Sequence, residues 1–220
     1  LEDGETLNLG FSEIGCRTYL AVRGGIEAPM AFGSTSTVPR EGIGGFSGGS
    51  LKPGDRLVAA RAEPIEPRRL AAAHRPRYHR RATVRVVPGY QQKHFSRLQQ
   101  RRFFGNEYRV SERCDRMGYR LEGPAIACDI DGILSEGIAP GAIQIPADGQ
   151  PIVLLNDRQT IGGYPKIGAA LSIDQAWLAQ LRPGDVVNFT PISEHTAHNA
   201  LHLARVFERS RRFEAFPADQ

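Results

Sequence analysis

Residues 149–166 place an apolar segment directly before a loop dense in polar side chains. The run 151–155 is typical of a buried strand, and 156–166 follows it with a glycine pair. Glycine lets a backbone approach a ligand closely. The loop side chains able to carry charge or hydrogen bonds include Asp157, Arg158, Gln159 and Lys166. This pattern predicts a binding or catalytic loop; the alternative is a solvated loop with turn glycines.

Composition limits the class of protein. The chain has 220 residues, of which 40% are hydrophobic, enough to bury a core in one large or two small domains. There is no apolar run of about 18 residues, and residues 1–4 show no signal-peptide pattern, so we expect a cytoplasmic protein. Cys16, Cys114 and Cys128 form no C-x-x-C pair, which favours reduced, structural thiols.

Basic residues are unevenly distributed. Only three of the 28 are lysines, at positions 52, 93 and 166, which makes the lysine in the polar loop conspicuous. The densest arginine run, within residues 61–85, is interrupted by prolines and predicts an irregular, solvated connector. Contact with a nucleic acid or another polyanion is the alternative, but only Tyr78 could stack on a base there.

Most other segments favour short strands separated by Gly, Pro and Asp, so we expect a mainly β protein. The strands are expected at 7–11, 18–22, 57–60, 83–87, 125–129 and 186–190. Turns of the form Leu-basic-Pro-Gly-Asp occur at 51–55 and 181–185. Each follows a glycine pair, which suggests a weak internal duplication of two similar β lobes.

Few helices are expected. Residues 172–175 match a capping box that opens a helix ending before Pro183. A short helix is expected near 95–103 and a longer one over 194–216. His198 and His202 have the i, i+4 spacing of a metal pair, but the intervening glutamate and a third ligand are missing. No metal site is therefore predicted.

Further motifs carry a family resemblance. They comprise Cys114-Asp-Arg-Met-Gly-Tyr-Arg-Leu-Glu-Gly-Pro124, Ser135-Glu-Gly-Ile138 and Gly141-Ala-Ile-Gln-Ile-Pro146. Together with 156–166 and 181–185 they resemble the carboxyltransferase-domain family. That family includes the C subunit of 5-oxoprolinase, the Kip antagonist KipA, the second subunit of allophanate hydrolase and the carboxyltransferase part of urea amidolyase. Segments 15–26, 33–37, 44–46, 51–55 and 84–89 agree with it, while Cys114 replaces a usual serine and Tyr90 a usual proline.

The resemblance implies two related cyclophilin-like β-barrel lobes with a few short helices. Family members carry a further segment ahead of Leu1, so the first lobe is expected to be N-terminally incomplete. The implied organisation is a remainder of the first lobe at 1–60, an Arg/Pro-rich connector and return strand at 61–87, a second lobe at 88–190, and a C-terminal helix and tail at 191–220.

The resemblance also implies a function. The chain is expected to be the C subunit of an ATP-dependent 5-oxoprolinase, a hydrolase that opens the lactam of 5-oxoproline to glutamate with A-type and KipI-like B-type subunits. ATP is expected at the level of the complex. Neither Met30 nor Met117 adjoins a lysine, so no covalent biotin is expected on this chain. The alternatives are a carboxyltransferase component acting on urea or allophanate, a choice that pocket shape decides, and a KipA-like regulatory partner without catalysis.

Site residues follow from the same resemblance. Asp157 and Lys166 are expected to be catalytic, the carboxylate handling a proton and the ammonium holding a carboxylate or a transferring group. The substrate-binding residues are expected to be Arg116, Tyr119 and Gln144 on a facing wall, and Arg158, Gln159, Gly162, Gly163 and Tyr164 in the loop. For Arg116 the alternative is a scaffold arginine paired with Asp115 or Glu122.

Overall fold

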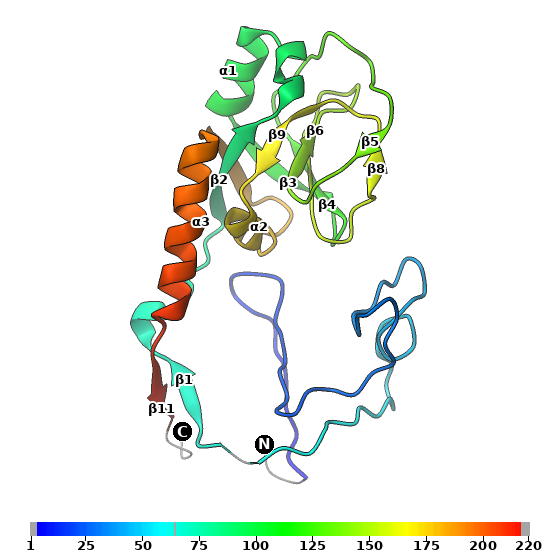
Figure 1. The fold of residues 1–220 in the computed structure, drawn as a ribbon, viewed down its shortest axis with the longest axis vertical. Coiled ribbons are helices and arrows are strands. Elements are labelled where there is room, and N and C mark those ends of the chain that lie inside the picture. The colour runs from blue at the N-terminus through cyan, green and yellow to red at the C-terminus, as the bar shows by residue number, and fades with distance from the viewer. Residues whose placement is uncertain (1–3, 64, 217–220) are drawn as a thin grey trace. The chain divides into compact units, whose positions relative to one another are not determined.

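The computed structural model describes residues 4–63 and 65–216. The chain divides into two compact units, one made of Leu1–Arg17 and Ala71–Arg212 and the other of Thr18–Leu70 and Phe213–Gln220. The first unit contains a closed seven-stranded β-barrel, shown in Figure 1. The mainly β fold with a few helices is therefore confirmed.

The barrel strands follow the order β10-β2-β9-β6-β7-β4-β3 and close through β3 and β10. Their bounds are β2 Arg81–Pro88, β3 Glu107–Cys114, β4 Gly118–Glu122, β6 Ala142–Gln144, β7 Ile152–Leu154, β9 Lys166–Ala170 and β10 Val186–Pro191. The β10–β2 pair is parallel and the other neighbours are antiparallel. Strands expected at 83–87, 151–155 and 186–190 are confirmed as β2, β7 and β10.

Alternation of side chains builds the barrel interior. In β2, Ala82, Val84 and Val86 are buried while the residues between them are more exposed, as expected for a strand with one face on a core. Phe103 stacks on Phe189 with the ring centroids 4.5 Å apart. Apolar burial of this kind is the main force that holds the barrel together.

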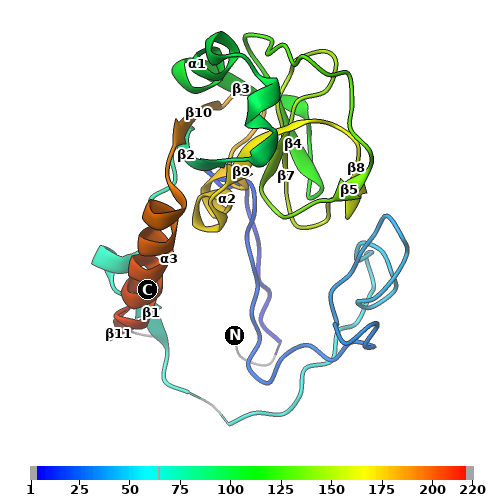
Figure 2. The ribbon, with the colours of Figure 1, turned by 45° about the horizontal axis from the view of Figure 1, so that its top comes forward.

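Outside the barrel strands the first unit has helices and a small strand pair. They are η1 Ala72–His74, η2 Tyr90–His94, α1 Arg97–Gly105, α2 Ser172–Leu178, α3 Glu194–Arg209, and the antiparallel pair β5 Glu136–Gly137 with β8 Ile161–Gly162. Of these, α1, α2 and the strand pair lie at the barrel, and α3 leads away from it (Figures 1 and 2). The short helix near 95–103 is confirmed. The long terminal helix stops at Arg209 rather than reaching residue 216, because the chain turns and residues 213–215 form a strand.

The second unit holds one two-stranded sheet, β1 Arg68–Leu70 against β11 Phe213–Ala215. Arg69 Nε contacts Glu214 Oε1 at 2.8 Å across it. The predicted connector therefore contains a strand, and the return strand β2 begins at Arg81, inside the arginine-rich run. The proposed boundaries of the four segments stay predictions.

The strands predicted at 7–11, 18–22 and 57–60 are wrong, as is the strand at 125–129. Between Gly4 and Glu63 the structure has turns, extended segments and three isolated bridges, Ile26↔Ala59, Ala31↔Ser34 and Val38↔Ile43. Large apolar side chains there, including Leu9, Phe11 and Tyr19, are exposed. A strand needs a run of paired residues, and these segments have at most an isolated bridge, that of Ala59 with Ile26.

Candidate functional site

Lys166 begins β9, where the polar loop enters the barrel. Its register is irregular: Ile143 pairs with Gly168 but Gln144 pairs with Lys166, so Ile167 is an extra residue on the β9 side. Such a bulge re-aims the side chains beside it. It places Lys166 opposite Gln144, and the two residues predicted from separate motifs become neighbours.

The Lys166 ammonium forms an ion pair with the Glu136 carboxylate of β5. The lysine side chain is only 14% exposed and that of Glu136 31%, so the pair is partly shielded from solvent. The Lys166 ammonium, followed by the Tyr90 hydroxyl, holds the pKa of Glu136 below its ordinary value. Glu136 is thus the ionised partner of the loop lysine.

Two residues of η2 fix this ion pair. Tyr90 donates its hydroxyl proton to Glu136, and this hydrogen bond raises the pKa of Tyr90. Gln91 is 5% exposed; its Nε2 donates to Glu136 Oε1 at 2.9 Å, and its Oε1 accepts from the backbone N–H of Lys166 at 2.8 Å. One buried amide therefore joins both partners of the pair.

Gln144 supplies an unused hydrogen-bond donor on the same wall. It is 1% exposed, and its Nε2 has no hydrogen-bond partner in the part of the chain that the structure describes. Buried polar groups are nearly always paired, with protein, water or a ligand. An unpaired buried donor therefore marks a place where an acceptor atom is expected to bind.

Gly162 packs directly against this amide. A Cβ at that position would lie 3.0 Å from Gln144 Nε2 and 2.4 Å from Ile138 Cδ1. Glycine is required there for lack of room rather than for a special backbone angle, and the glycine pair of the predicted loop gains a physical reason. Gly163, next in the chain, accepts a hydrogen bond from the Ile133 N–H at 2.8 Å through its carbonyl.

The other loop residues have different contacts. Arg158 Nε donates to the Ile138 carbonyl at 3.0 Å, tying the loop to the segment after β5. Asp157 pairs with Arg116, with Oδ2 2.8 Å from Nε. The arginine thus takes neither of the scaffold partners expected from sequence, Asp115 and Glu122, in its ion pair. The remaining loop side chains differ in exposure: Gln159 is half-buried and Tyr164 is exposed.

Tyr119 does not share the wall that Gln144 lines. Tyr119 pairs with Val153, and Val153 pairs with Ile143, the neighbour of Gln144. Directly paired residues share a face and adjacent residues face opposite ways, so Tyr119 and Gln144 lie on opposite faces of the sheet. The expected common wall is therefore corrected.

The Tyr119 hydroxyl instead lies 3.2 Å from the Ala179 carbonyl and 3.1 Å from that of Leu181, and accepts from Arg17 Nη1 at 2.9 Å. Burial raises the pKa of Tyr119 to about 12. This tyrosine joins β4 to Arg17 and to the segment that follows α2, which is a structural role.

Three residues of the cluster were not predicted from sequence: Glu136, Tyr90 and Gln91. Glu136 lies in a motif that carries the family resemblance, and Tyr90 stands out in the sequence only as a departure from the family. Their distance in sequence from Lys166 hides the cluster. The sequence offers one signal, the rarity of lysine, which draws attention to Lys166. A lysine that is half-buried in the fold needs a carboxylate partner.

Other kinds of site find no support in the described residues. No group of three or more His, Cys, Asp and Glu side chains there could hold a metal ion. None of the helices that the structure describes is long and apolar enough to cross a bilayer. Free thiols remain at Cys16, Cys114 and Cys128, and burial raises the pKa of the last two, as expected for unreactive structural thiols.

Fold and site together define a β-barrel protein whose outer face carries a polar cluster around Lys166. Residues 1–191 match the family described as "Carboxyltransferase domain, subdomain A and B", and the chain belongs to this family.

The chain is similar to two proteins named as the C subunit of 5-oxoprolinase. It is 38% identical to that of Escherichia coli over 91% of its own length and 37% identical to that of Haemophilus influenzae over 86%. It spans 64% and 60% of the lengths of these relatives.

Among solved structures it is similar to the urea carboxylase of Kluyveromyces lactis. The TM-score is 0.79 at 26% identity, covering 90% of this chain and 19% of that one. Sequence similarity extends to the urea amidolyase of Saccharomyces cerevisiae, at 28% identity over 89% of this chain and 12% of the relative.

Proposed function

We propose that this chain acts as the C subunit of an ATP-dependent 5-oxoprolinase, together with A-type and KipI-like B-type subunits in the cytoplasm. The overall reaction consumes 5-oxoproline, ATP and two water molecules and yields glutamate, ADP and phosphate. The observation that carries the proposal is the buried, unpaired Gln144 amide beside Gly162 and the Lys166–Glu136 ion pair. Similarity to two subunits of that name supports the choice of reaction.

The geometry suits a cyclic amide that carries a carboxylate. Gln144 Nε2 would donate to the lactam oxygen, which polarises the carbonyl for attack. Lys166 would hold the substrate carboxylate or a transferring group, with Glu136, Gln91 and Tyr90 keeping the ammonium in place. The site thereby binds both polar ends of the substrate with groups fixed before it arrives.

The remaining loop residues have graded roles in this proposal. Asp157 is proposed to handle a proton, with Arg116 holding its carboxylate in position. Arg158 shapes the loop through its bond to Ile138. ATP is proposed to bind to the complex, and no covalent biotin is proposed on this chain. Tyr119 is assigned to the fold, and the residues proposed to border the substrate are Gln159, Gly163 and Tyr164.

A reconstitution experiment tests the proposal. Glutamate release from 5-oxoproline and ATP is measured with the A and B subunits in the presence and absence of this chain. Release should require the chain and should fall by at least about a hundredfold with Lys166→Met, as expected for loss of a fixed charge that stabilises the transition state. Lys52→Met is the matched control, because Lys52 is exposed and lies outside the site.

Equal release without the chain, no release in any mixture, or full activity of Lys166→Met would contradict the proposal. A second candidate substrate is urea, because the chain is similar to urea carboxylase and urea amidolyase. ATP-dependent consumption of urea by the same mixture, with no glutamate formed from 5-oxoproline, would favour that substrate. A regulatory, KipA-like role would be favoured by two results together: Lys166→Met still binds the B subunit, and neither reaction requires the chain.

A further inference from the structure

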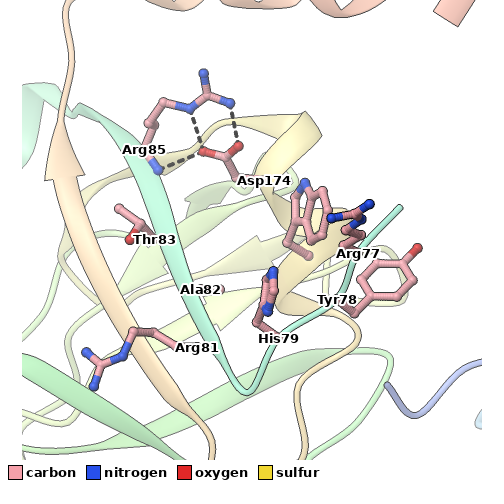
Figure 3. A pocket seen from close by; sticks show the side chains of 9 residues that line it. Arg77, Tyr78, His79, Arg81, Ala82, Thr83, Arg85 and Asp174 are labelled. Carbon is pink, nitrogen blue, oxygen red and sulfur yellow. Dashed lines mark hydrogen bonds and ion pairs between the residues drawn. The ribbon is translucent and has the colours of Figure 1, made fainter. Parts of the chain in front are cut away.

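A pocket lies between α2 and the segment that leads into β2 (Figure 3). Its volume is about 470 Å³, in the range of sites for small organic ligands. None of its lining residues belongs to the Lys166 cluster, and Figures 1 and 2 place α2 and the β5–β8 pair at different sides of the barrel. The pocket is therefore separate from the site proposed above.

Two aromatic rings form one part of this pocket. Tyr78 and Trp177 meet edge to face, with centroids 5.2 Å apart and an interplanar angle of 63°. Trp177 is 38% exposed, so part of its side chain is open to a ligand. An exposed aromatic ring inside a hollow is a stacking surface for another flat ring.

The carboxylate in the pocket is already neutralised. Asp174 is 4% exposed and accepts three hydrogen bonds from Arg85: from its backbone N and Nε at 2.8 Å each, and from Nη2 at 2.5 Å. This bidentate pair, drawn in Figure 3, leaves no free negative charge among the lining residues. A cationic ligand would find no partner here.

Positive charge, in contrast, remains available. Arg81 pairs with Glu107 on the adjoining strand, but Arg77 has no ion pair or hydrogen bond within residues 4–63 and 65–216. In Figure 3 the Arg77 side chain lies close to the Tyr78 ring, which in turn meets Trp177 edge to face. A planar fork of donors beside an aromatic ring matches an anionic group attached to a ring.

We propose that this pocket binds a small ligand that joins a flat ring to a phosphate or carboxylate group. The ring stacks on Trp177 and the anion binds Arg77. Neither Gln144 nor Lys166 takes part, so this second site does not depend on the proposed 5-oxoprolinase reaction.

Trp177 also reports on the pocket, because it is the only tryptophan in the chain. Its fluorescence, excited at the red edge of its absorption where adenine does not absorb, is followed during titration with AMP, benzoate, adenosine and inorganic phosphate. AMP or benzoate should change it saturably. Adenosine and phosphate should each bind at least about tenfold more weakly than AMP, since each lacks one of the two contacts. Comparing AMP with benzoate shows whether the pocket prefers a phosphate or a carboxylate.

Variants test the assignment of each contact. Arg77→Gln should weaken binding of the better anionic probe about tenfold and leave adenosine binding unchanged. Arg101→Gln, an exposed arginine of α1 outside the pocket, is the matched control. Trp177→Leu should weaken binding about tenfold when measured by equilibrium dialysis, which needs no fluorescence.

The proposal is overturned if neither AMP nor benzoate binds saturably, if phosphate alone binds as well as AMP, or if Arg77→Gln behaves as Arg101→Gln does. Circular dichroism of each variant shows that it is folded. Because Arg77 is exposed and makes no contact that the fold requires among the described residues, loss of binding by Arg77→Gln is assigned to the pocket.

Discussion

At the scale of single residues, the Lys166–Glu136 pair shows how the ammonium of Lys166 is held in one position. Gln91 contacts both sides of the pair and Tyr90 caps the carboxylate. An ammonium fixed in this way loses little side-chain freedom when a ligand binds, which favours affinity. The sequence marks the lysine through its rarity, but the carboxylate partner comes from a strand whose pairing with β8 only the fold reveals.

The pH dependence of stability tests this pair. The folded pKa of Glu136 lies below its ordinary value of 4.5, so the unfolded chain takes up the proton first as the pH falls. The stabilisation is therefore present above about pH 4.5 and is lost as the pH falls through the lowered pKa. We expect Glu136→Gln to lower the urea midpoint at neutral pH, and the difference from the unaltered chain to shrink in acid.

Urea denaturation over a pH series measures this difference. Glu122→Gln is the control, because Glu122 is exposed at the end of β4 and no ion pair of it is found in the described structure. A difference between Glu136→Gln and the unaltered chain that stays constant down to strongly acid pH would show that the carboxylate charge does not stabilise the fold.

Gly162→Ala tests the space beside the Gln144 amide. The added methyl group would meet Ile138 Cδ1 at 2.4 Å and Gln144 Nε2 at 3.0 Å. We expect a loss of about 1–3 kcal/mol of stability from overpacking, and a larger relative loss of 5-oxoproline turnover because the methyl group would displace the Gln144 amide that is proposed to bind the substrate. Gly137→Ala is matched to it: Gly137 lies in β5, paired with β8, and an added Cβ meets no atom within 4 Å.

Both variants are compared by urea midpoint and by glutamate release in the reconstituted mixture. If Gly162→Ala has the same turnover and stability as Gly137→Ala, the close packing of Gly162 on Gln144 does not matter for the reaction or for the fold.

At the scale of elements, helix starts show where sequence reasoning fails. Residues 172–175 match a capping box, but the N-cap of α2 is Leu171, whose side chain cannot accept a hydrogen bond, and Ser172 is already helical. The third position, Asp174, is buried, and its carboxylate binds Arg85 rather than the first turn of the helix. In contrast, two serines do cap their helices through backbone N–H groups of the first turn, Ser96 in α1 and Ser193 in α3.

Serine substitutions separate these cases. Ser96→Ala should cost about 1 kcal/mol of stability, because it leaves an N–H of the first turn of α1 without its partner. Ser172→Ala should change stability by no more than a few tenths of a kcal/mol, since its side chain caps nothing. Urea unfolding of the two variants checks this, and an equal cost for both would mean that the observed caps do not set the stability of these helices.

Some elements of the barrel and of the site could be predicted from the sequence, and others could not. Strands β2, β7 and β10 were predictable because Val84, Val153 and Phe189 lie in apolar runs that alternate or are bounded by turn residues. The β9 bulge that sets Lys166 opposite Gln144 has no such local signal, and the inner-face position of Tyr119 follows only from the register of β4 on β7. Loop motifs thus predicted candidate residues, while pairing between strands determines which of them are neighbours.

At the scale of the whole molecule, stability is expected to be very uneven along the chain. The barrel closes on itself, so its strands have no open edge, and residues such as Val84, Phe103 and Val187 are fully buried. Residues 18–63 make few backbone hydrogen bonds, their described bridges are isolated, and side chains such as Tyr19 and Phe32 are exposed. The apolar composition of 18–22 and 57–60 predicted strands, but composition alone cannot supply a partner strand.

Amide hydrogen exchange measures this contrast directly. In the isolated chain, amides of β2 and β10 should exchange only through global unfolding, because they are bonded on a parallel pair at the centre of the core. Amides in residues 18–63 should exchange within the time of local opening, since few apolar contacts must break to expose them. Peptide-resolved exchange with mass spectrometry distinguishes the two ranges. Protection of 18–63 equal to that of β2 would mean that this part of the chain shares the stability of the barrel, and that its exposed apolar side chains are covered in solution.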